Sequence, residues 1–420
     1  MEQDRPLFGF SRNVLVAGLV SLLMDISSEM IYPLVPLFLS TVLGVNVTVI
    51  GLIEGVAEAA ASLLKGVSGR LSDHLGRRKG LMLAGYAVSS LSRPLMATAA
   101  LWQQVLAARL IDRLGKGVRT APRDAIIAES TAPTHLGRAF SLHRALDTVG
   151  AVLGPGLAIW IMSRLGNNAY QTVFWLATLP ALGAVALVAV GISETRPAKR
   201  PAVDGRPTWA AFSWRTKLFI AIASLFAFGN SSDAFLILRA RQAGVGAVAI
   251  PAVYLVFNLV YSLSAFPAGW AADRLGKRRV ILLGFLLFAG LYWGFARVSG
   301  RGEVWGLFAL YGLFMGLTEG VQKAFLAAIT TPSGKATAFG VYATATGLAT
   351  LPASLIGGWL WEHVSPAATF YFGAGTAGLA ALLFAAFMFW DEGQGRLLGC
   401  CASTPHRQII SSHAATDGTL

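Results

Sequence analysis

Charged residues are scarce in this sequence of 420 residues. Asp, Glu, Lys and Arg together make up 13% of the chain, whereas soluble globular domains contain about 25%. Hydrophobic residues account for 55%, the mean hydropathy is +0.60, and the deficit of charge extends over the whole length. This pattern excludes a soluble domain with a single membrane anchor. Because about 20 apolar residues span a bilayer, the length allows roughly a dozen spans with short loops.

Cysteine is nearly absent as well. The two cysteines, Cys400 and Cys401, are adjacent in a polar carboxyl-terminal stretch, so they form neither a disulfide framework nor a metal-ligand pattern. The sequence contains no phosphate-binding loop, no metal-ligand cluster and no nucleophile elbow. Gly115 and Gly117 follow no predicted strand, which favours helix packing over a dinucleotide site. We therefore expect no enzyme, no cofactor, no metal site and no transport driven by ATP.

Positive charge exceeds negative charge, with a net charge of +13 and a pI of about 10.1. Such an excess is typical of nucleic-acid-binding proteins and of membrane proteins with basic cytoplasmic loops. Here the bases stand in short segments between apolar runs, which favours a multi-pass protein of a bacterial-type inner membrane and no nucleic-acid partner. The positive-inside rule then predicts both termini in the cytoplasm. Its basic side holds Arg5, Arg12, Arg70, Arg77, Arg78, Lys79, Arg138, the stretch 193–215, Arg274, Lys277, Arg278, Arg279 and Lys335.

Twelve apolar runs occur in two sets of six. They predict an all-α membrane protein with twelve transmembrane helices in two pseudo-symmetric six-helix bundles. The predicted domains are an amino-terminal bundle at 1–192, a cytoplasmic linker at 193–215, a carboxyl-terminal bundle at 216–392 and a polar cytoplasmic tail at 393–420. The runs lie at about 14–42, 47–68, 80–101, 103–128, 139–162, 170–192, 217–239, 246–268, 280–298, 303–328, 337–360 and 367–390.

An internal repeat relates the two sets. Parallel repeats of this kind indicate a duplicated six-helix unit, as in the two halves of many secondary transporters. Three motifs of the first set recur about 200 residues later: Gly69 to Arg78 as Gly269 to Arg278, Ser27-Ser28-Glu29 as Ser231-Ser232-Asp233, and Gly117-Val118 as Gly320-Val321.

The chain resembles the major facilitator superfamily over roughly residues 12–392. The loop after the second run of each half is similar to the signature loop of that family. Gly76 permits a tight turn there, Gly69 allows two helices to approach closely, and the bases hold the loop at the anionic cytoplasmic face. The resemblance implies that Asp73 helps to latch the outward-facing state. The signature residues are Gly69, Asp73, Gly76, Arg77 and Arg78, with Gly269, Asp273 and Gly276 in the second copy.

Two further motifs resemble those of bacterial drug/proton antiporters. The segment Arg113 to Gly117 is similar to a family motif that is linked to proton coupling, and Gly150, Gly154 and Pro155 resemble the antiporter motif of exporters. The resemblance implies a transporter that works by alternating access, commonly as a monomer.

Charges inside the predicted spans are the candidate functional residues. Each charge at the bilayer centre costs about 3 kcal/mol, so these residues pair with one another or line a wet cavity. Residues four apart share a helix face, which places the acids of run 14–42 on one stripe and the bases of run 103–128 on another. The candidates are Asp25, Glu29, Glu54, Glu58, Arg109, Asp112, Arg113 and Lys116 in the first half, and Asp233 and Asn258 in the second.

The family fold implies that the acids of run 14–42 face the bases of run 103–128. Our hypothesis is that Asp25, Glu29 and Arg113 form a proton-coupling and substrate cluster; the alternative is a set of static salt bridges. Glu319 and Lys323, four residues apart, are expected to pair with each other. An aromatic pocket in the second half is a further candidate, formed by Phe228, Phe235, Tyr254, Tyr261 and Trp293.

The predicted function is secondary active transport, with proton-coupled efflux of a small molecule as the leading interpretation. The expected partners are protons, a small-molecule substrate and the lipid bilayer. A proton symporter or a facilitative uptake carrier is one alternative, and a non-transporting receptor or accessory protein on the same scaffold is another. Acidic and basic stripes are both present, so the sequence leaves the charge of the substrate open.

Overall fold

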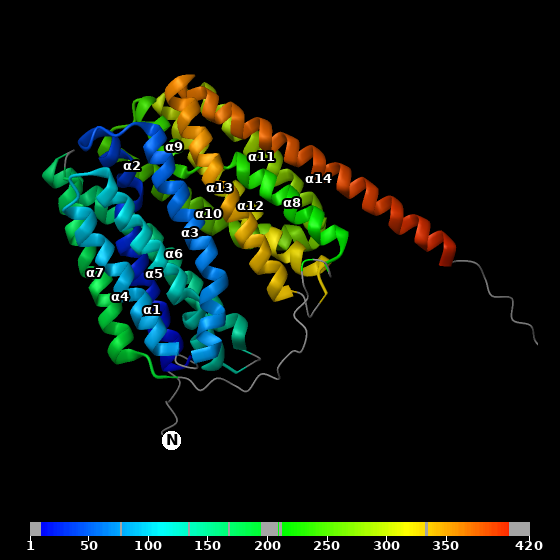
Figure 1. Ribbon diagram of the computed structural model, residues 1–420, viewed down its shortest axis with the longest axis horizontal. Coiled ribbons are helices and arrows are strands. Elements are labelled where there is room, and N and C mark those ends of the chain that lie inside the picture. The colour runs from blue at the N-terminus through cyan, green and yellow to red at the C-terminus, as the bar shows by residue number, and fades with distance from the viewer. Residues whose placement is uncertain are drawn as a thin grey trace, which may run out of the picture.

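The computed structural model describes residues 10–75, 78–132, 135–166, 169–194, 209, 212–331 and 335–402, with the backbone alone for 65–75, 335–336 and 391–402. Helices make up nearly all of this part of the chain (Figure 1). Their bounds are α1 Arg12–Ile31, η1 Tyr32–Leu34, α2 Val35–Leu37, η2 Phe38–Val42, α3 Val47–Leu75, α4 Arg78–Ala97, α5 Trp102–Glu129, α6 Leu136–Leu165, α7 Tyr170–Gly191, α8 Trp214–Gly229, α9 Asp233–Gln242, η5 Ala247–Ala249, α10 Ile250–Leu275, α11 Lys277–Arg297, α12 Arg301–Ile329, α13 Lys335–His363 and α14 Pro366–Ala402.

Ten helical segments among the described residues are long and apolar enough to cross a membrane. The first of them combines α1, η1, α2 and η2 into Arg12–Val42, and another combines α8 and α9 into Trp214–Gln242. The predicted spans 80–101 and 103–128 form α4 and α5, which are helical but less apolar. The all-helical membrane class is therefore confirmed, and ten of the twelve predicted spans meet the requirement for apolar length.

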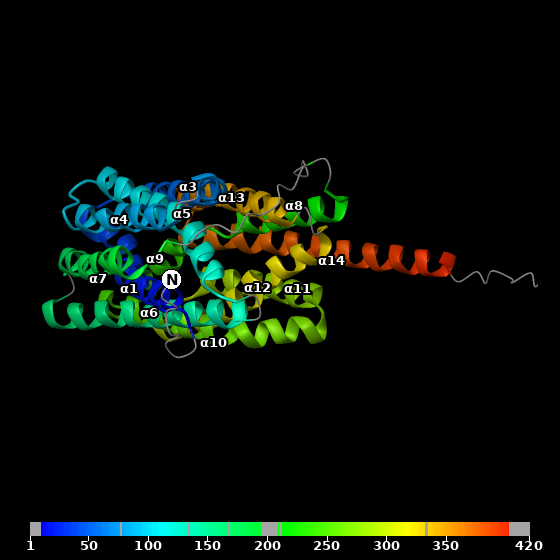
Figure 2. The same ribbon diagram turned by 90° about the horizontal axis from the view of Figure 1, so that it is seen from below.

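Most helix contacts fall within one or the other predicted half. In the first, α1 packs on α6 and α7, and α5 packs on α3 and α4; in the second, α10 packs on α12, and α14 packs on α8 and α11. Shorter contacts join α2 and α3 to α9, η1 to α10 and η5 to α6, but two pairs of long helices form most of the contacts between the sets, α3 with α13 and α6 with α10. Figure 2 shows these pairs along opposite edges of the molecule, so they flank the space between the sets.

The α3–α13 contact is close because glycines lie on both helices. A Cβ on Gly358 would meet the Cα of Thr48 at 2.7 Å, and one on Gly55 would meet the Cα of Leu351 at 3.2 Å. Backbones that approach this closely gain van der Waals contact, which is the main attraction between helices in lipid. The two sets converge at the top of Figure 1 and separate toward the bottom, where α1 begins.

Two spans are interrupted near the middle of the molecule. Pro33 and Pro36 have no backbone N–H to donate, and the α-helix ends at Ile31 in a 3₁₀ turn, a short α turn and a π turn. The predicted helix 217–239 is divided by a non-helical stretch at Asn230–Ser232. There Ser232 caps α9 by accepting a hydrogen bond from the N–H of Ala234 at 3.2 Å. This break places Asp233 in the first turn of α9.

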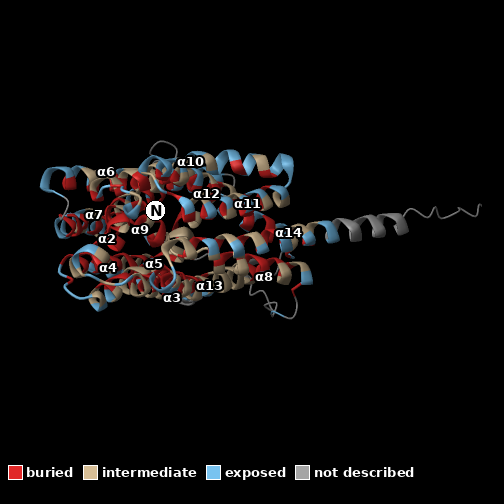
Figure 3. Cartoon of the chain, turned by 90° about the horizontal axis from the view of Figure 1, so that it is seen from above, coloured by how far each residue is buried: buried red, intermediate tan, exposed pale blue. Residues whose placement is uncertain are grey.

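Large apolar side chains cover the outer surface of the bundle. Leu91, Leu179, Val190, Leu382 and Phe389 are exposed, and Figure 3 shows buried residues where the helices face one another and exposed ones along the outer faces. A surface of this kind would be unfavourable in water, so it is the face that contacts lipid.

The ends of the chain differ in part from the predicted boundaries. The helix α14 continues to Ala402, ten residues into the stretch that was predicted to be a polar tail, and its backbone includes Cys400 and Cys401. The rest of the tail, 403–420, and most of the predicted linker, 195–208 and 210–211, lie outside the described residues.

Candidate functional site

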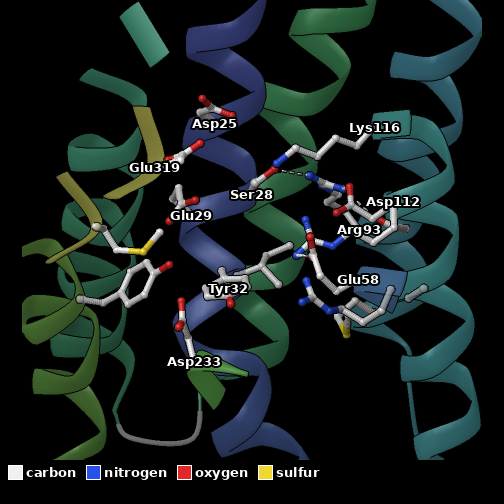
Figure 4. A pocket seen from close by; sticks show the side chains of 18 residues that line it. Asp25, Ser28, Glu29, Tyr32, Glu58, Arg93, Asp112, Lys116, Asp233 and Glu319 are labelled. Carbon is white, nitrogen blue, oxygen red and sulfur yellow. Dashed lines mark hydrogen bonds and ion pairs between the residues drawn. The ribbon is translucent and has the colours of Figure 1, made fainter. Parts of the chain in front are cut away.

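A cavity of about 380 Å³ lies between the two sets of helices. Eight of the ten predicted site residues line it. The other two contact lining residues, Glu54 through its ion pair with Arg109 and Asn258 through its hydrogen bond to Glu29. Figure 4 shows Asp25, Glu29, Asp233 and Glu319 on one side of the view, and Lys116, Arg93, Asp112 and Glu58 on the other. Its lining residues are Asp25, Ser28, Glu29, Ile31, Tyr32, Glu58, Ser92, Arg93, Met96, Ala108, Arg109, Asp112, Arg113, Lys116, Asp233, Tyr254, Met315 and Glu319.

Two ion pairs connect α3 with α5. Glu54 pairs with Arg109, and one helical turn further Glu58 pairs with Arg113 at 3.6 Å. Because both the acids and the arginines are four residues apart, each set lies on one face of its helix, and the same type of ion pair occurs twice, one turn apart. The ion-pair partner of Arg113 is thus Glu58 of α3 and neither Asp25 nor Glu29, although Asp25, Glu29 and Arg113 all line the cavity.

Arg93 on α4 is a site residue that the sequence analysis missed. Its guanidinium pairs with Asp112, and it donates to the hydroxyls of Ser27 at 3.0 Å and Ser28 at 2.8 Å and to the carbonyl of Ser89 at 2.7 Å. A signal was present, because Arg93 is a single charge within the apolar run 80–101, and such residues are functional candidates. The arginine joins α1, α4 and α5 at the cavity wall.

Three carboxylates of the cavity have no basic partner among the described residues. Asp25 forms neither a hydrogen bond nor an ion pair there, Glu29 accepts a weak hydrogen bond from Asn258 at 3.4 Å, and Asp233 accepts one from the Tyr311 hydroxyl at 2.8 Å. The arginines Arg93, Arg109 and Arg113, in contrast, each have their own carboxylate. The acidic side of the cavity is thus the side that is open to a positive ligand.

Aromatic rings complete the acidic side. The rings of Tyr32 and Tyr254 lie 5.4 Å apart, and the guanidinium of Arg109 lies 5.3 Å from the centre of Tyr32. Of the other aromatic candidates, Tyr261 lines a second cavity, Phe235 is buried in the core, Phe228 packs on Phe372, and Trp293 is half exposed. The predicted aromatic pocket of the second half is therefore not formed as one unit.

The glycines of the α6 motif bring α6 directly against the two α1 acids. A Cβ on Gly150 would meet the Cβ of Asp25 at 2.9 Å, and one on Gly154 would meet the Cβ of Glu29 at 2.7 Å. The two glycines are four residues apart on α6 and the two acids are four residues apart on α1. Each turn of α6 therefore places one glycine against one acid of α1. The glycines of the α5 motif also lie at close helix contacts: a Cβ on Gly115 would meet the carbonyl oxygen of Gly85 at 2.6 Å, and one on Gly117 would meet the Cβ of Leu64 at 2.7 Å.

We expect Gly154→Ala to destabilise the protein by about 1–3 kcal/mol, because the new methyl group meets both Glu29 and the carbonyl of Ile26 and must push α1 away. Thermal unfolding of the purified protein in detergent measures the effect. Gly156→Ala is the matched control, since nothing lies within 4 Å of its added Cβ. Equal stability of the two variants would contradict the close contact of α1 and α6.

A polar network crosses between the sets next to a second cavity of about 440 Å³. Arg144 on α6 donates to the hydroxyl of Tyr261 on α10 at 2.6 Å, and this hydroxyl donates to Glu319 on α12. Lys323 pairs with Glu319 at 3.1 Å, which confirms the predicted pair. Glu319 and Met315 line both cavities, so the network lies at their junction.

The signature loops are only partly described. Gly76 and Arg77 lie outside the described residues, as do the side chain of Asp73 and the surroundings of Gly69. Arg78 is buried and pairs with Glu129 at 2.7 Å. In the second copy, Gly276 has a φ of +92°, as its predicted turn requires. Asp273 pairs with Lys277 of its own half at 3.4 Å, and no described atom lies within 4 Å of a Cβ on Gly269.

Comparison with known proteins agrees with the fold. The profile of the Major Facilitator Superfamily matches residues 17–257 and 218–397. An uncharacterized MFS-type transporter of Methanocaldococcus jannaschii is 35% identical over 392 residues, which are 91% of this chain and 96% of that protein. Multidrug resistance protein MdtH of Photorhabdus laumondii is 22% identical over 350 residues, which are 81% of this chain and 85% of that protein.

Solved structures of low sequence identity share the fold. The human organic anion transporter MFSD10 has a TM-score of 0.64 at 18% identity, with 89% of this chain and 99% of that one covered. A POT family transporter in complex with 5-aminolevulinic acid has a TM-score of 0.76 at 11% identity, with coverages of 91% and 97%. Since the family profile spans most of the residues and one relative is 35% identical over nearly its full length, the chain belongs to the Major Facilitator Superfamily of membrane transporters.

Proposed function

We propose that this protein is a secondary active transporter that exchanges protons for a positively charged small molecule across the inner membrane. The observation that supports the proposal is the set of three cavity carboxylates, Asp25, Glu29 and Asp233, that form no ion pair with any described residue. A carboxylate that is removed from water and forms no ion pair is unfavourable. Protons or a cationic substrate can supply the missing charge.

Competition for these carboxylates would produce antiport. A proton and a cation that bind the same oxygens exclude each other, so the arrival of one favours the release of the other. Symport would instead require separate positions for the two ligands. The relation to a multidrug resistance protein supports export as the direction, and the proposed substrate is an organic cation that the rings of Tyr32 and Tyr254 can also contact.

Alternating access fits the arrangement of the helices. The two sets meet through α3–α13 and α6–α10 and separate toward the end where α1 begins. We propose that residues 1–192 and 216–392 rock about the cavity as two bundles within a monomer, with both termini in the cytoplasm. Under the positive-inside rule this structure then represents an inward-open state. Asp73 would act in the outward-facing state, in which the two bundles close at the cytoplasmic side.

Proton release from everted vesicles tests the proposal. The vesicles are acidified inside, a pH dye reports the lumen, and ethidium, an organic anion and a divalent metal ion are added in turn. Ethidium is expected to cause proton efflux with the wild-type protein. Asp25→Asn and Asp233→Asn are expected to reduce the efflux at least about tenfold, because an amide cannot exchange a proton.

Glu303→Gln provides the matched control, since Glu303 is an exposed acid in the first turn of α12 and lies outside the cavity. Efflux that follows the anion alone would overturn the proposed substrate charge. Passive equilibration of ethidium without any proton movement would overturn antiport.

A further inference from the structure

A buried group of polar side chains lies between α1 and α6, behind the cavity. His143 of α6 lies 2.8 Å through Nε2 from the hydroxyl oxygen of Ser21 on α1, and 3.5 Å through Nδ1 from Asp147 Oδ2. His143 is 5% exposed and Ser21 is 1% exposed. The second oxygen of Asp147, Oδ1, is buried and has no hydrogen-bond partner in the described part of the chain. An acceptor that is buried without a partner is costly, so its presence calls for a functional explanation.

This group is adjacent to the acidic side of the cavity. Ser21 and Asp25 are four residues apart on α1, and His143 and Asp147 are four apart on α6, so each pair shares a helix face. The Cβ of Asp25 packs on Gly150, which is three residues from Asp147 and lies on the same face of α6. The order Asp25, Asp147, His143 therefore runs from the cavity toward the amino-terminal end of α6.

Basic residues surround the group on the remaining sides. Arg123 of α5 donates to the Ser21 hydroxyl at 3.3 Å and pairs with Asp124 at 2.8 Å. Asp147 is in the electrostatic field of Asp25 on α1, Lys116 and Arg123 on α5, and Arg144 on its own helix. His143 is in the field of Arg123 and Arg144. These neighbours form no ion pair with Asp147 among the described residues, so its charge depends on the proton that it carries.

The spatial arrangement of Ser21, His143 and Asp147 resembles that of a nucleophile, its base and an orienting acid, but a hydrolytic role does not fit. Ser21 is buried, and its oxygen already accepts from Arg123. A series of neighbouring titratable groups, of which His143 is hydrogen-bonded to Ser21 and lies 3.5 Å from Asp147, is suited instead to the transfer of protons.

We propose that Asp147, His143 and Ser21 form a proton relay between Asp25 and the open side of the bundle; the inference rests on the proposed proton exchange. In the first step the carboxyl of Asp25 gives its proton to the carboxylate of Asp147. Asp147 then gives a proton to Nδ1 of His143, which produces a carboxylate and an imidazolium. The imidazolium releases its Nε2 proton through the hydroxyl of Ser21 to water, so one proton leaves Asp25 and one enters the water.

The test compares coupled and uncoupled transport in proteoliposomes, with ethidium as the probe. Proton flux driven by an ethidium gradient is recorded with a pH dye, and exchange of ethidium at equal pH is recorded separately. His143→Gln and Asp147→Asn are expected to lower the proton flux at least about tenfold and to leave the exchange within about twofold of wild type. His135→Gln is the matched control, since His135 is exposed and precedes the same helix.

A second measurement needs no substrate. Infrared difference spectra between acidic and alkaline pH record the carboxyl groups that titrate, and Asp147→Asn is expected to remove one such band that His135→Gln retains. If the flux and the exchange fall together in His143→Gln, the residue is structural and the relay is wrong. If both relay variants keep wild-type flux while Asp25→Asn loses it, the relay is wrong and proton exchange stands. If the wild-type protein moves no protons, both proposals fail.

Discussion

Arg93→Met is expected to destabilise the protein by at least about 3–5 kcal/mol, the usual cost of breaking a buried ion pair by removing one partner. The reason lies in the contacts of the guanidinium, which pairs with Asp112 and donates to Ser27, Ser28 and Ser89. Methionine satisfies none of these groups, so a carboxylate is left at the wall without its cation. The amount of folded protein after purification and the midpoint of thermal unfolding in detergent measure the loss.

Two further variants make this test specific. Arg164→Met removes an exposed arginine of α6 and is expected to change the stability by less than about 0.5 kcal/mol. The double variant Arg93→Met with Asp112→Asn is expected to recover part of the loss, because no uncompensated carboxylate remains. Stability of Arg93→Met at the wild-type level would refute the role of Arg93 as the residue that joins α1, α4 and α5.

The second large effect is a difference between two equivalent acids on α3. Glu54→Gln is expected to cost about 3–5 kcal/mol, because Glu54 and Arg109 are both buried, with side chains 7% exposed. Glu58→Gln is expected to cost less, about 1–2 kcal/mol, because the Glu58 side chain is 43% exposed and its ion pair is long, at 3.6 Å, although the Arg113 side chain is only 13% exposed. Thermal unfolding of the two purified variants under one set of conditions gives the difference.

In a transport assay the larger effect is expected for Glu58, the acid whose replacement costs less stability. Glu58 lines the cavity, so its replacement is expected to alter ethidium transport in protein that is fully folded. Arg109→Gln in the Glu54→Gln background tests the buried pair, since removal of both charges is expected to restore stability relative to Glu54→Gln alone. Equal losses of stability in Glu54→Gln and Glu58→Gln would show that burial does not govern these pairs.

The internal repeat places related motifs in different chemical surroundings. In the first half, the serines of Ser27-Ser28-Glu29 accept hydrogen bonds from Arg93. In the second half, the hydroxyl of Tyr292 donates to the carbonyl of Ser231 at 3.3 Å, and the helix is broken there. A charged residue thus organises one half and an aromatic residue the other. Neither arrangement supplies a cation to the acid of the motif, since Glu29 and Asp233 both form no ion pair with a described residue.

The sequence was sufficient to predict eight of the charged residues that line the cavity, but not Arg93 and not the partners of these charges. The spacing of four residues between Asp25 and Glu29 correctly placed both on the cavity face of α1. Spacing defines which residues share a face of one helix, whereas the partner of a charge depends on how neighbouring helices are rotated and how closely they approach. For that reason the pairs of α5 with α3, and of Arg93 with Asp112, were not predicted.

What the sequence determined by itself is the class of protein: the scarcity of charge, the apolar runs and the repeated loop motif are properties of the chain that hold in any packing. Only the tertiary structure decided which charges are neutralised. Ion pairs require contacts of a few ångströms. The close approach of α6 to α1 at Gly150 and Gly154 is steric and brings no described cation into ion-pair contact with Asp25 or Glu29. The three carboxylates that remain without a cation, and with them the proposed charge of the substrate, are a consequence of that packing.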